Sequence, residues 1–377
     1  MSAKGDTEIS SEKLVDGKLI GQEKRRKWQA KQENKAKRQK KEEQWEQLLS
    51  QYGATRVYQN DVQSLNESTL TTNAKLIRPY LDLQDGGARK SVQGDSSTSE
   101  SLFIAEGTET VRLLIQQSTQ NEDAIEIVSI FVKPSVLFEP PVSLLTNVKE
   151  AGANCDDSRP PWSILVGDEE TLSSVAGFHI ARGALACGVV PDRDEAWLLD
   201  YYLPKLQQDT ATKNGGLRLL ALDGISDTAN LGSMIRCASA FGVRAIIMSR
   251  DCCDAWYRRS VRVSMGHVFL IPIVRVDNLG VTIQRLSSSR EPFSVTSYAA
   301  VIDTNADLIL EDVKPGTIPN SWCCVMGNEA NGISKHVIKA CNHTIRIGMT
   351  LGVDSLSVPI ATGILLHGLQ EKELASK

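Results

Sequence analysis

Three glycine-punctuated loops in the last part of the chain carry the residues whose types and spacing could do chemistry. The first loop contains Asn230, Gly232 and Arg236. Asn230 and Arg236 are less than two turns apart on a helix, so both side chains can face one cleft. The second loop is 327–329 (Gly-Asn-Glu), and the third is 345–358. Because α/β sheets bind ligands at the loops that follow their strands, this arrangement predicts a loop-built ligand site.

These loops match neither of the common nucleotide-binding fingerprints. The chain has no G-x-G-x-x-G between a strand and a helix and no G-x-x-x-x-G-K-[ST]. A dinucleotide-binding fold and a P-loop enzyme are therefore disfavoured. Taken singly, the loop residues also have ordinary structural explanations: Glu329 and Ser355 as helix caps, and Arg236 as half of a surface ion pair. The residue types alone predict a ligand site without identifying its ligand.

Alternating strands and helices must position the three loops. We expect strands over 217–223, 244–248, 268–274, 322–326 and 344–349, and helices over 230–241 and 355–369. This alternation predicts an α/β domain at 217–377. A second, smaller α/β unit is predicted at 75–187, with strands over 102–105, 125–132 and 163–166. Residues 188–216 are expected to link the two units.

Residues 1–74 form a polar extension. Disorder is expected over 1–21, and ten of the eighteen residues from Lys24 to Lys41 are Lys or Arg. Residues 22–50 are rich in helix formers, which predicts a basic helix. That helix is either solvated and single, an RNA-contacting arm or a nuclear-localisation patch. The Gly/Ser-rich stretch 86–101 is expected to be a flexible loop.

The net charge of −4 hides an asymmetry. Residues 1–50 hold 13 Lys/Arg and 9 Asp/Glu, a net of 13 − 9 = +4, so the remainder carries −4 − 4 = −8. A mildly acidic body with a basic arm is not the profile of a generally basic nucleic-acid binder. No apolar run reaches the roughly 18–20 residues of a membrane helix, so no membrane partner is expected. The first twenty residues are acidic and lack the apolar stretch of a secretory signal.

The eight cysteines contain no C-x-x-C pair and no accompanying pair of histidines, so no metal site is expected. Without a secretion signal, reduced thiols in an intracellular compartment are the simplest interpretation. We expect a cytoplasmic protein, with the nucleus or an organelle left open.

Taken in order, the three loops resemble the motifs of the SpoU (TrmH-type) RNA methyltransferases of the SPOUT superfamily. The family's N-x-G-x-x-x-R is present at 230–236, its G-N-E at 327–329, and its third motif at Ile347, Met349, Ser355-Leu356 and Val358. Residues 262–266 are similar to the family's R-x-S-x-G stretch. A weaker resemblance links Phe103-Ile-Ala-Glu106-Gly107 to the F-x-x-E-G of the family's small N-terminal substrate-binding domain.

This resemblance implies an α/β fold with a deep C-terminal trefoil knot. It implies that S-adenosylmethionine binds in a bent form in the knot, and that a homodimer builds its active site at the subunit interface. The implied reaction is methyl transfer to a ribose 2′-hydroxyl of tRNA or rRNA, without a metal. Such a reaction combines a positive sulfonium with a developing alkoxide, so a dry pocket assists it.

The resemblance also implies residue roles. The catalytic group would be Asn230, Arg236, Glu329 and Ser355. The cofactor would be held by Gly327, Asn328, Ile347, Met349, Leu356 and Ser357. RNA would be contacted by Arg258, Arg259 and Arg262. Because the pKa of arginine exceeds about 12, a stabiliser of phosphate or alkoxide is favoured over a general base for the arginine of the first loop.

Two departures from the family pattern lie in the third loop. Gly348 stands before Met349 where the family usually has proline, and Ser357 stands where it usually has asparagine. Pro359 follows in the first turn of the expected helix, where the missing N–H is tolerated. The alternative to an active enzyme is therefore a noncatalytic RNA-binding or assembly factor on the same scaffold.

Overall fold

The structure is a computed structural model. It describes residues 8–58, 76–81, 83, 101–120, 124–138, 144–153, 162–180, 183–208, 216–288, 294–350 and 355–373. Side chains are described from Trp28 onward, apart from those of residues 38, 145 and 151–153. The expected flexible loop at 86–101 lies almost wholly outside these residues, as does Cys155. The chain divides into two compact units, Met1–Thr55 and Arg56–Lys377.

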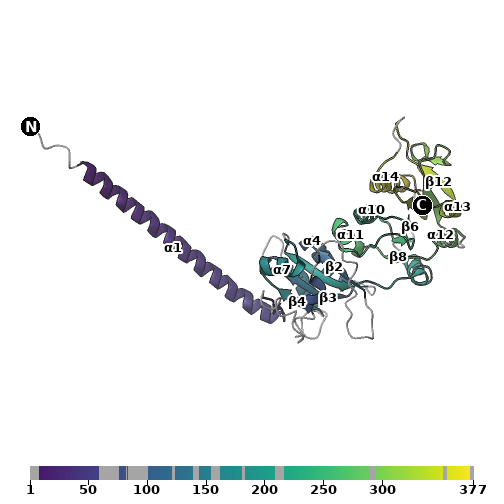
Figure 1. The fold of residues 1–377 in the computed structure, drawn as a ribbon. Helices are drawn as coiled ribbons and strands as arrows, with labels where there is room; N and C mark the ends of the chain where they lie inside the picture. The colour runs from purple at the N-terminus through teal and green to yellow at the C-terminus, as the bar shows by residue number, and fades with distance from the viewer. Residues whose placement is uncertain are drawn as a thin grey trace, which may run out of the picture. The chain divides into compact units, whose positions relative to one another are not determined.

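The first unit is built on one helix, α1 (Glu8–Gln51) (Figure 1). All its described side chains from Trp28 to Glu43 are exposed, so this part of the helix presents no buried apolar stripe. The helix includes residues 8–21, for which disorder was the expectation. Gly17 and Gly21 each cost only about 1 kcal/mol against the helix formers around them, which a helix of this length can absorb.

The second unit begins with a small α/β domain around a mixed sheet. The sheet has the order β1 (Thr55–Arg56), β4 (Ser163–Val166), β3 (Ile127–Val132), β5 (Ala184–Val189), β2 (Leu102–Glu106). β3 and β4 are parallel, whereas β5 runs antiparallel to both β3 and β2. The helices are η2 (Arg78–Tyr80), α4 (Thr108–Gln120), α5 (Pro134–Phe138), α6 (Leu145–Ala153) and α7 (Glu169–Ala176). The three strands expected from the sequence are all present.

The C-terminal domain contains a sheet of seven parallel strands. Its order is β10 (Leu308–Ile309), β12 (His343–Arg346), β9 (Thr296–Ala300), β11 (Trp322–Gly327), β6 (Arg218–Asp223), β7 (Ala245–Met248), β8 (Ile273–Arg275). The strand expected at 268–274 is shorter, because Pro272 cannot donate to a ladder. Residues 267–269 form the short helix η4 instead.

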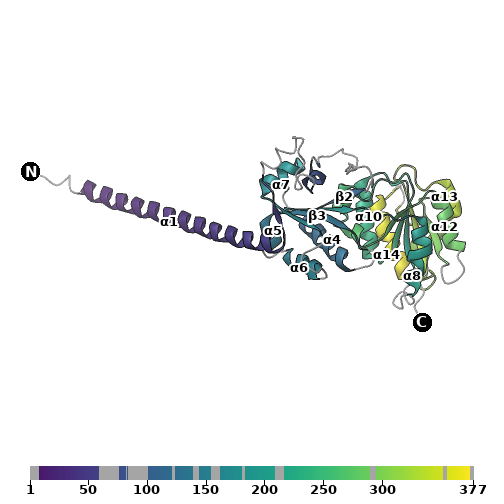
Figure 2. The same ribbon diagram turned by 90° about the horizontal axis from the view of Figure 1, so that it is seen from below.

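Helices cover both faces of this sheet (Figure 2). α12 (Leu279–Ser288) and α13 (Lys335–Ala340) share one core with η3 (Trp197–Tyr202) and α8 (Leu203–Gln208). The remaining helices include α10 (Thr228–Ala240), α11 (Arg258–Val263), η5 (Leu310–Asp312) and α14 (Val358–Glu371), of which α10 packs on both α11 and α14. Residues 197–208, expected to be part of a linker, therefore belong to the C-terminal core: Leu198 and Leu203 are buried there.

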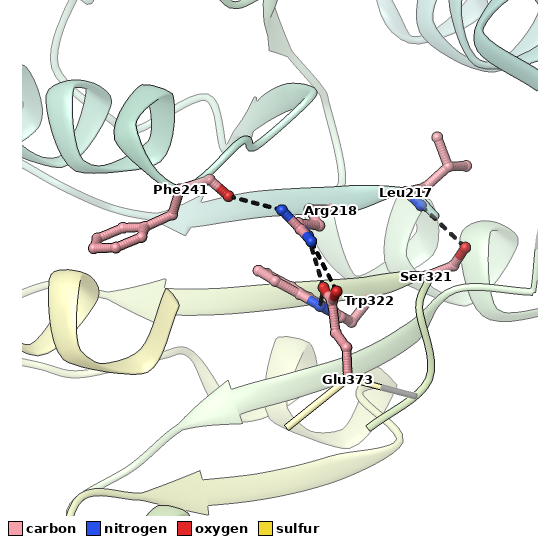
Figure 3. A network of polar contacts seen from close by, with 6 residues as sticks. All are labelled: Leu217, Arg218, Phe241, Ser321, Trp322 and Glu373. Atoms are coloured by element: carbon pink, nitrogen blue, oxygen red, sulfur yellow. Dashed lines mark hydrogen bonds and ion pairs between the residues drawn. The ribbon is translucent and has the colours of Figure 1, made fainter. Parts of the chain in front are cut away.

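One carboxylate ties the starts of two central strands to the segment after α14 (Figure 3). Arg218 Nε and Nη2 donate to the two oxygens of Glu373 at 2.6 and 2.8 Å. The indole N–H of Trp322 donates to Glu373 Oε1 at 2.7 Å. We call these three residues the Glu373 clamp. Because Arg218 begins β6 and Trp322 begins β11, the clamp fixes the end of α14 against the centre of the sheet.

Within the described part of the chain, no helix is long and apolar enough to cross a membrane. The same residues contain no cluster of three His, Cys, Asp or Glu side chains that could hold a metal ion. The described cysteines are all free thiols.

Candidate functional site

The site is centred where β6 and β11 end side by side. The two strands are parallel and in register, and their last residues, Asp223 and Gly327, are partners. The loops that follow them therefore leave the sheet at the same edge. Asp223 Oδ2 joins the loops further by accepting hydrogen bonds from the N–H and the hydroxyl of Ser334, both at 2.7 Å.

The first loop delivers Asn230 to the start of α10. Asp227 caps this helix by accepting from the N–H groups of Ala229 and Asn230, at 2.9 and 2.8 Å. Gly232 lies two residues later, where α10 crosses α11 closely. A Cβ at this position would lie 2.7 Å from the carbonyl oxygen of Ser260, so the crossing requires glycine. In the Asn-x-Gly motif, the asparagine therefore belongs to the candidate site, whereas the glycine is required for helix packing.

The second loop folds back on itself directly after β11. The N–H and C=O of Asn328 pair with those of Gly332 at 3.1 and 2.9 Å. A Cβ on Gly327 would lie 2.3 Å from the backbone of Gly332 and of Ile333, so only glycine permits this closure. The Asn328 side chain also donates to the carbonyl of Gly224 at 2.7 Å, which connects the second loop to the first.

Glu329 bridges the same two loops by a side-chain contact. Its Oε1 accepts a hydrogen bond from Asn230 Nδ2 at 2.5 Å. Glu329 is exposed and lines a cavity, whereas Asn230 is half-buried. The contact orients the amide of Asn230 relative to the cavity wall.

The cavity has a volume of about 720 Å³ and lies between the second loop, the third loop and the start of α14. All six residues predicted to hold a cofactor line it, as do two of the four predicted catalytic residues: Gly327, Asn328, Ile347, Met349, Leu356, Ser357, Glu329 and Ser355. Its wall is completed by apolar side chains such as Ile333 and Leu365. Ligand pockets commonly span about 300–1,000 Å³, so the volume suits one small organic molecule.

One of the two departures in the third loop has a local structural reason. The N–H of Gly348 donates to Glu311 Oε2 at 2.9 Å, a bond that proline could not form. Ser357 is the N-cap residue of α14 but makes no side-chain capping hydrogen bond, so the structure gives no reason for serine in place of asparagine. Pro359 sits in the first turn of that helix, as expected.

Arg236 lies apart from the cavity. It is exposed on α10 and is not among the residues that line the cavity. Its charge acts on His267, a residue that the sequence did not single out: burial, and then the Arg236 guanidinium, lower the pKa of His267. Among the described residues, the buried Nδ1 of His267 has no hydrogen-bond partner.

The three arginines predicted to contact RNA have different surroundings. Arg258 is largely buried, with Nη1 2.6 Å from Glu106 Oε2. Arg262 is half-exposed and lies 3.4 Å from the same oxygen. Arg259 is exposed. Arg258 and Arg262 thus share one carboxylate inside the protein, and the RNA-binding role of all three arginines stays a prediction.

Sequence reasoning missed three aspartate and serine anchors of the site. Asp223, Asp227 and Ser334 hold the loops but carry no motif of their own. A local signal existed only for Asp227, because an aspartate three positions before the helical Asn230 is a common N-cap. The Asp223–Ser334 contact joins residues that are distant in sequence, so no local pattern predicts it.

Comparison with known proteins relates the C-terminal domain to a described family. The sequence profile of the SpoU rRNA Methylase family matches residues 218–367. A protein of Mycobacterium tuberculosis called uncharacterized tRNA/rRNA methyltransferase Rv0881 is 30% identical over 199 residues, which cover 52% of this chain and 62% of that protein. The 23S rRNA (guanosine-2'-O-)-methyltransferase RlmB of Haemophilus ducreyi is 28% identical over 208 residues, covering 55% of this chain and 78% of that enzyme. The match to the Mycobacterium protein thus spans less than two thirds of its length.

Solved structures share the fold. The AdoMet-bound rRNA methyltransferase of Sinorhizobium meliloti superposes with a TM-score of 0.51 at 23% identity, covering 71% of this chain and 87% of that one. The SpoU methyltransferase AviRb of Streptomyces viridochromogenes, in complex with AdoMet, gives a TM-score of 0.56 at 18% identity, covering 80% and 97%.

Proposed function

Because residues 218–367 belong to the SpoU methylase family, we propose that this protein transfers a methyl group from S-adenosylmethionine to a ribose 2′-hydroxyl of tRNA or rRNA. The observation that carries the proposal is the cavity of about 720 Å³, which collects the second loop, the third loop and the start of α14. These are the segments that the resemblance to the family assigns to the cofactor.

The residues of the cavity fit S-adenosylmethionine. Its wall combines apolar side chains, such as Ile347 and Leu356, with the backbone that follows β11. Such a wall suits a nucleoside, since the ring packs on apolar groups while backbone polar groups fix its orientation. Gly327 keeps the loop closed along one side of the cavity. Once bound, the cofactor supplies an electrophilic methyl group on a positively charged sulfur.

The protein's own groups would assist the attacking 2′-oxygen as it loses its proton. Arg236 would stabilise the developing alkoxide or the adjacent phosphate, since its guanidinium stays charged. Asn230, held by Glu329, would orient the ribose. Ser355, at the cavity wall, would line the path of the methyl group.

The proposed enzyme is a homodimer with a knotted C-terminal domain, as the family resemblance implies. Two observations support the dimer. Arg236 lies outside the cavity-lining set of its own chain, so a second copy could supply it to the site. α14 also exposes two large apolar side chains, Ile360 and Ile364, which a partner could cover.

The test is methylation of total tRNA and rRNA with labelled S-adenosylmethionine. Wild-type protein should place label on ribose, where it survives as a nuclease-resistant dinucleotide, and Arg236→Ala should lose it. Arg285→Ala is the matched control, because this exposed arginine lies on α12 and pairs with Glu195. Label on a base, or none at all, would overturn the proposal.

The second candidate is a noncatalytic RNA-binding or assembly factor, which the glycine and serine of the third loop favour. Titration calorimetry separates the candidates. Micromolar binding of S-adenosylmethionine supports the enzyme, whereas RNA binding without cofactor binding supports the assembly factor.

A further inference from the structure

A cluster of aromatic side chains joins the small domain to the C-terminal domain. Phe103 on β2 is buried, with its ring centroid 5.0 Å from that of Trp256 and 5.5 Å from that of Phe269. Trp256 and Phe269 are buried as well and lie 6.2 Å apart. Such clusters are the most strongly stabilising parts of contact surfaces, because each ring removes a large apolar area from water. The three rings therefore form an apolar centre for the contact between the domains.

A charged pair lies beside these rings. Glu106 Oε2 accepts from Arg258 Nη1 at 2.6 Å, and the two side chains are only 18% and 15% exposed. The Arg258 guanidinium also lies 4.6 Å from the ring centroid of Phe178. A paired, largely buried charge is costly to separate, because the partner that remains is left desolvated. The pair thus gives the contact a defined register, which apolar packing alone does not.

Glycines make room for both halves of the contact. A Cβ on Gly188, in β5, would lie 2.6 Å from the Phe103 ring. A Cβ on Gly266 would lie 3.3 Å from both Thr110 of α4 and the Phe269 ring. Gly266 also has a φ of +81°, which glycine adopts without strain. The two domains therefore approach closely because each has a glycine, without a side chain, at the contact.

We propose that these residues form an interdomain lock, made of Phe103, Glu106, Trp256, Arg258 and Phe269, which sets the ribose that is methylated. The lock holds the small domain in one orientation on the methylase domain. RNA held by the small domain then presents one nucleotide to the cavity. Glu106 and Arg258 are positioning residues in this scheme. The inference rests on the proposed function and extends it to the choice of target nucleotide.

The experiment uses the full chain with charge changes in the lock. The variants are Glu106→Arg, Arg258→Glu and the double exchange, and the milder Glu106→Gln serves if a single charge reversal fails to fold. Glu109→Gln is the matched control, since this carboxylate lies on the exposed side of α4 and pairs with Arg112. Three quantities are measured: the positions of methylation mapped across tRNA and rRNA, kcat/KM for RNA, and the affinity for S-adenosylmethionine.

We expect each single variant to lose at least tenfold in kcat/KM for RNA and to spread its methylation over additional nucleotides. Cofactor affinity should stay at the wild-type value, and the double exchange should restore a single position. A merely destabilising change would lower the yield of folded protein without moving the methylated position. Unchanged positions and unchanged kcat/KM in the single variants would overturn the lock.

Differential scanning calorimetry tests the lock separately from the proposed function. Coupled domains should unfold in one transition in the wild type and in two when the pair is reversed, whether or not the protein methylates RNA. A wild type without methylation would overturn the proposed function alone. A single, unshifted transition in every variant would show that the pair does not couple the domains.

Discussion

Individual atoms at the ends of β6 and β11 determine whether the site can form. The loop after β11 closes only because Gly327 carries no side chain, and Asn230 is hydrogen-bonded to Glu329 of the cavity wall. The sequence places these residues in motifs but does not show the reason for each. The structure separates two kinds of motif position: those that touch the cavity, and those, such as Gly232, that let helices approach.

Replacing Gly327 by alanine should open the second loop. The new Cβ would lie 2.3 Å from two backbone atoms, and relieving such overpacking costs about 1–3 kcal/mol. We expect a lower urea midpoint and at least a tenfold loss of S-adenosylmethionine affinity by calorimetry. Gly332→Ala is the control, because its Cβ would meet nothing within 4 Å and only the left-handed φ of +66° opposes it. Equal losses of cofactor affinity in both variants would contradict the steric explanation.

His267 should make the protein sensitive to acid. Burial and the charge of Arg236 lower its pKa in the folded chain, so protonation favours the unfolded chain. The stability contributed by the neutral imidazole is complete above the unfolded pKa of about 6.5 and is lost as the pH falls through the folded pKa. We expect the melting temperature to fall less steeply between pH 6.5 and 5 in His267→Gln than in the wild type. Parallel curves from scanning calorimetry would refute this role.

At the scale of elements, helix starts and strand ends place the site. α10 starts at its Asp227 cap, and α14 starts at Ser357, which also lines the cavity. The two helices pack together, so the orientation of one constrains the other. The position of Asn230 therefore depends on the stability of the first turn of α10.

Removing the cap of α10 should destabilise the C-terminal domain. Asp227→Ala leaves the N–H groups of Ala229 and Asn230 without their acceptor, which costs about 1 kcal/mol. Asp227→Asn keeps a capping oxygen and should cost much less. Both are measured as urea unfolding free energies of the full chain. If asparagine proved as damaging as alanine, the role of Asp227 would not be capping.

Local patterns predicted the elements that have strong apolar runs. The strand over 163–166 has the predicted bounds, and those over 217–223 and 322–326 differ from theirs by a single residue at one end. Local patterns do not predict β9, whose Thr-Ser-Tyr-Ala-Ala run is short and partly polar, or the two-residue β10. Both are formed by pairing with neighbouring strands, which a local pattern does not contain.

The sequence predicts those residues of the candidate site that belong to a recognisable motif. The family resemblance assigned six residues to a cofactor, and the structure gathers all six around one cavity. The motifs do not show that Arg258 pairs with Glu106, because this partner lies in another domain. Contacts between residues distant in sequence carry no local signal, so both the lock and the Asp223–Ser334 tie required the fold.

At the scale of the whole molecule, a few long-range contacts join parts that the sequence keeps far apart. The interdomain lock joins β2 to the region around α11, and the Glu373 clamp joins the segment after α14 to β6 and β11. The basic helix α1 belongs to a separate compact unit, and its contact with RNA stays a prediction. Under the proposed function, the acidic remainder of the chain would recognise RNA through local cations such as Arg259 and Arg236.

Breaking the Glu373 clamp should destabilise the C-terminal domain as a whole. Arg218 and Glu373 have side chains only 19% and 12% exposed, and leaving one partner of such a pair unmatched costs about 3 kcal/mol. We expect Glu373→Gln to lower the urea midpoint markedly. The control is Glu371→Gln, an exposed carboxylate two positions earlier whose loss should change stability by less than about 0.5 kcal/mol. Matching midpoints for the two variants would argue against the clamp.

The order of strands in the C-terminal sheet also affects how the chain behaves during synthesis. β6 pairs with β7, which follows it closely, but its other neighbour, β11, is made only after β8, β9 and β10. Pairing across so long a separation is slow, because the entropy of closing the loop precedes the gain from contacts. Until β11 is synthesised, β6, an apolar strand that is buried in the final structure, has one unpaired edge that other chains can reach. If translation pauses after β6 but before β11, the nascent chain therefore exposes an apolar strand edge. Chaperones bind such surfaces, and aggregation can start from them.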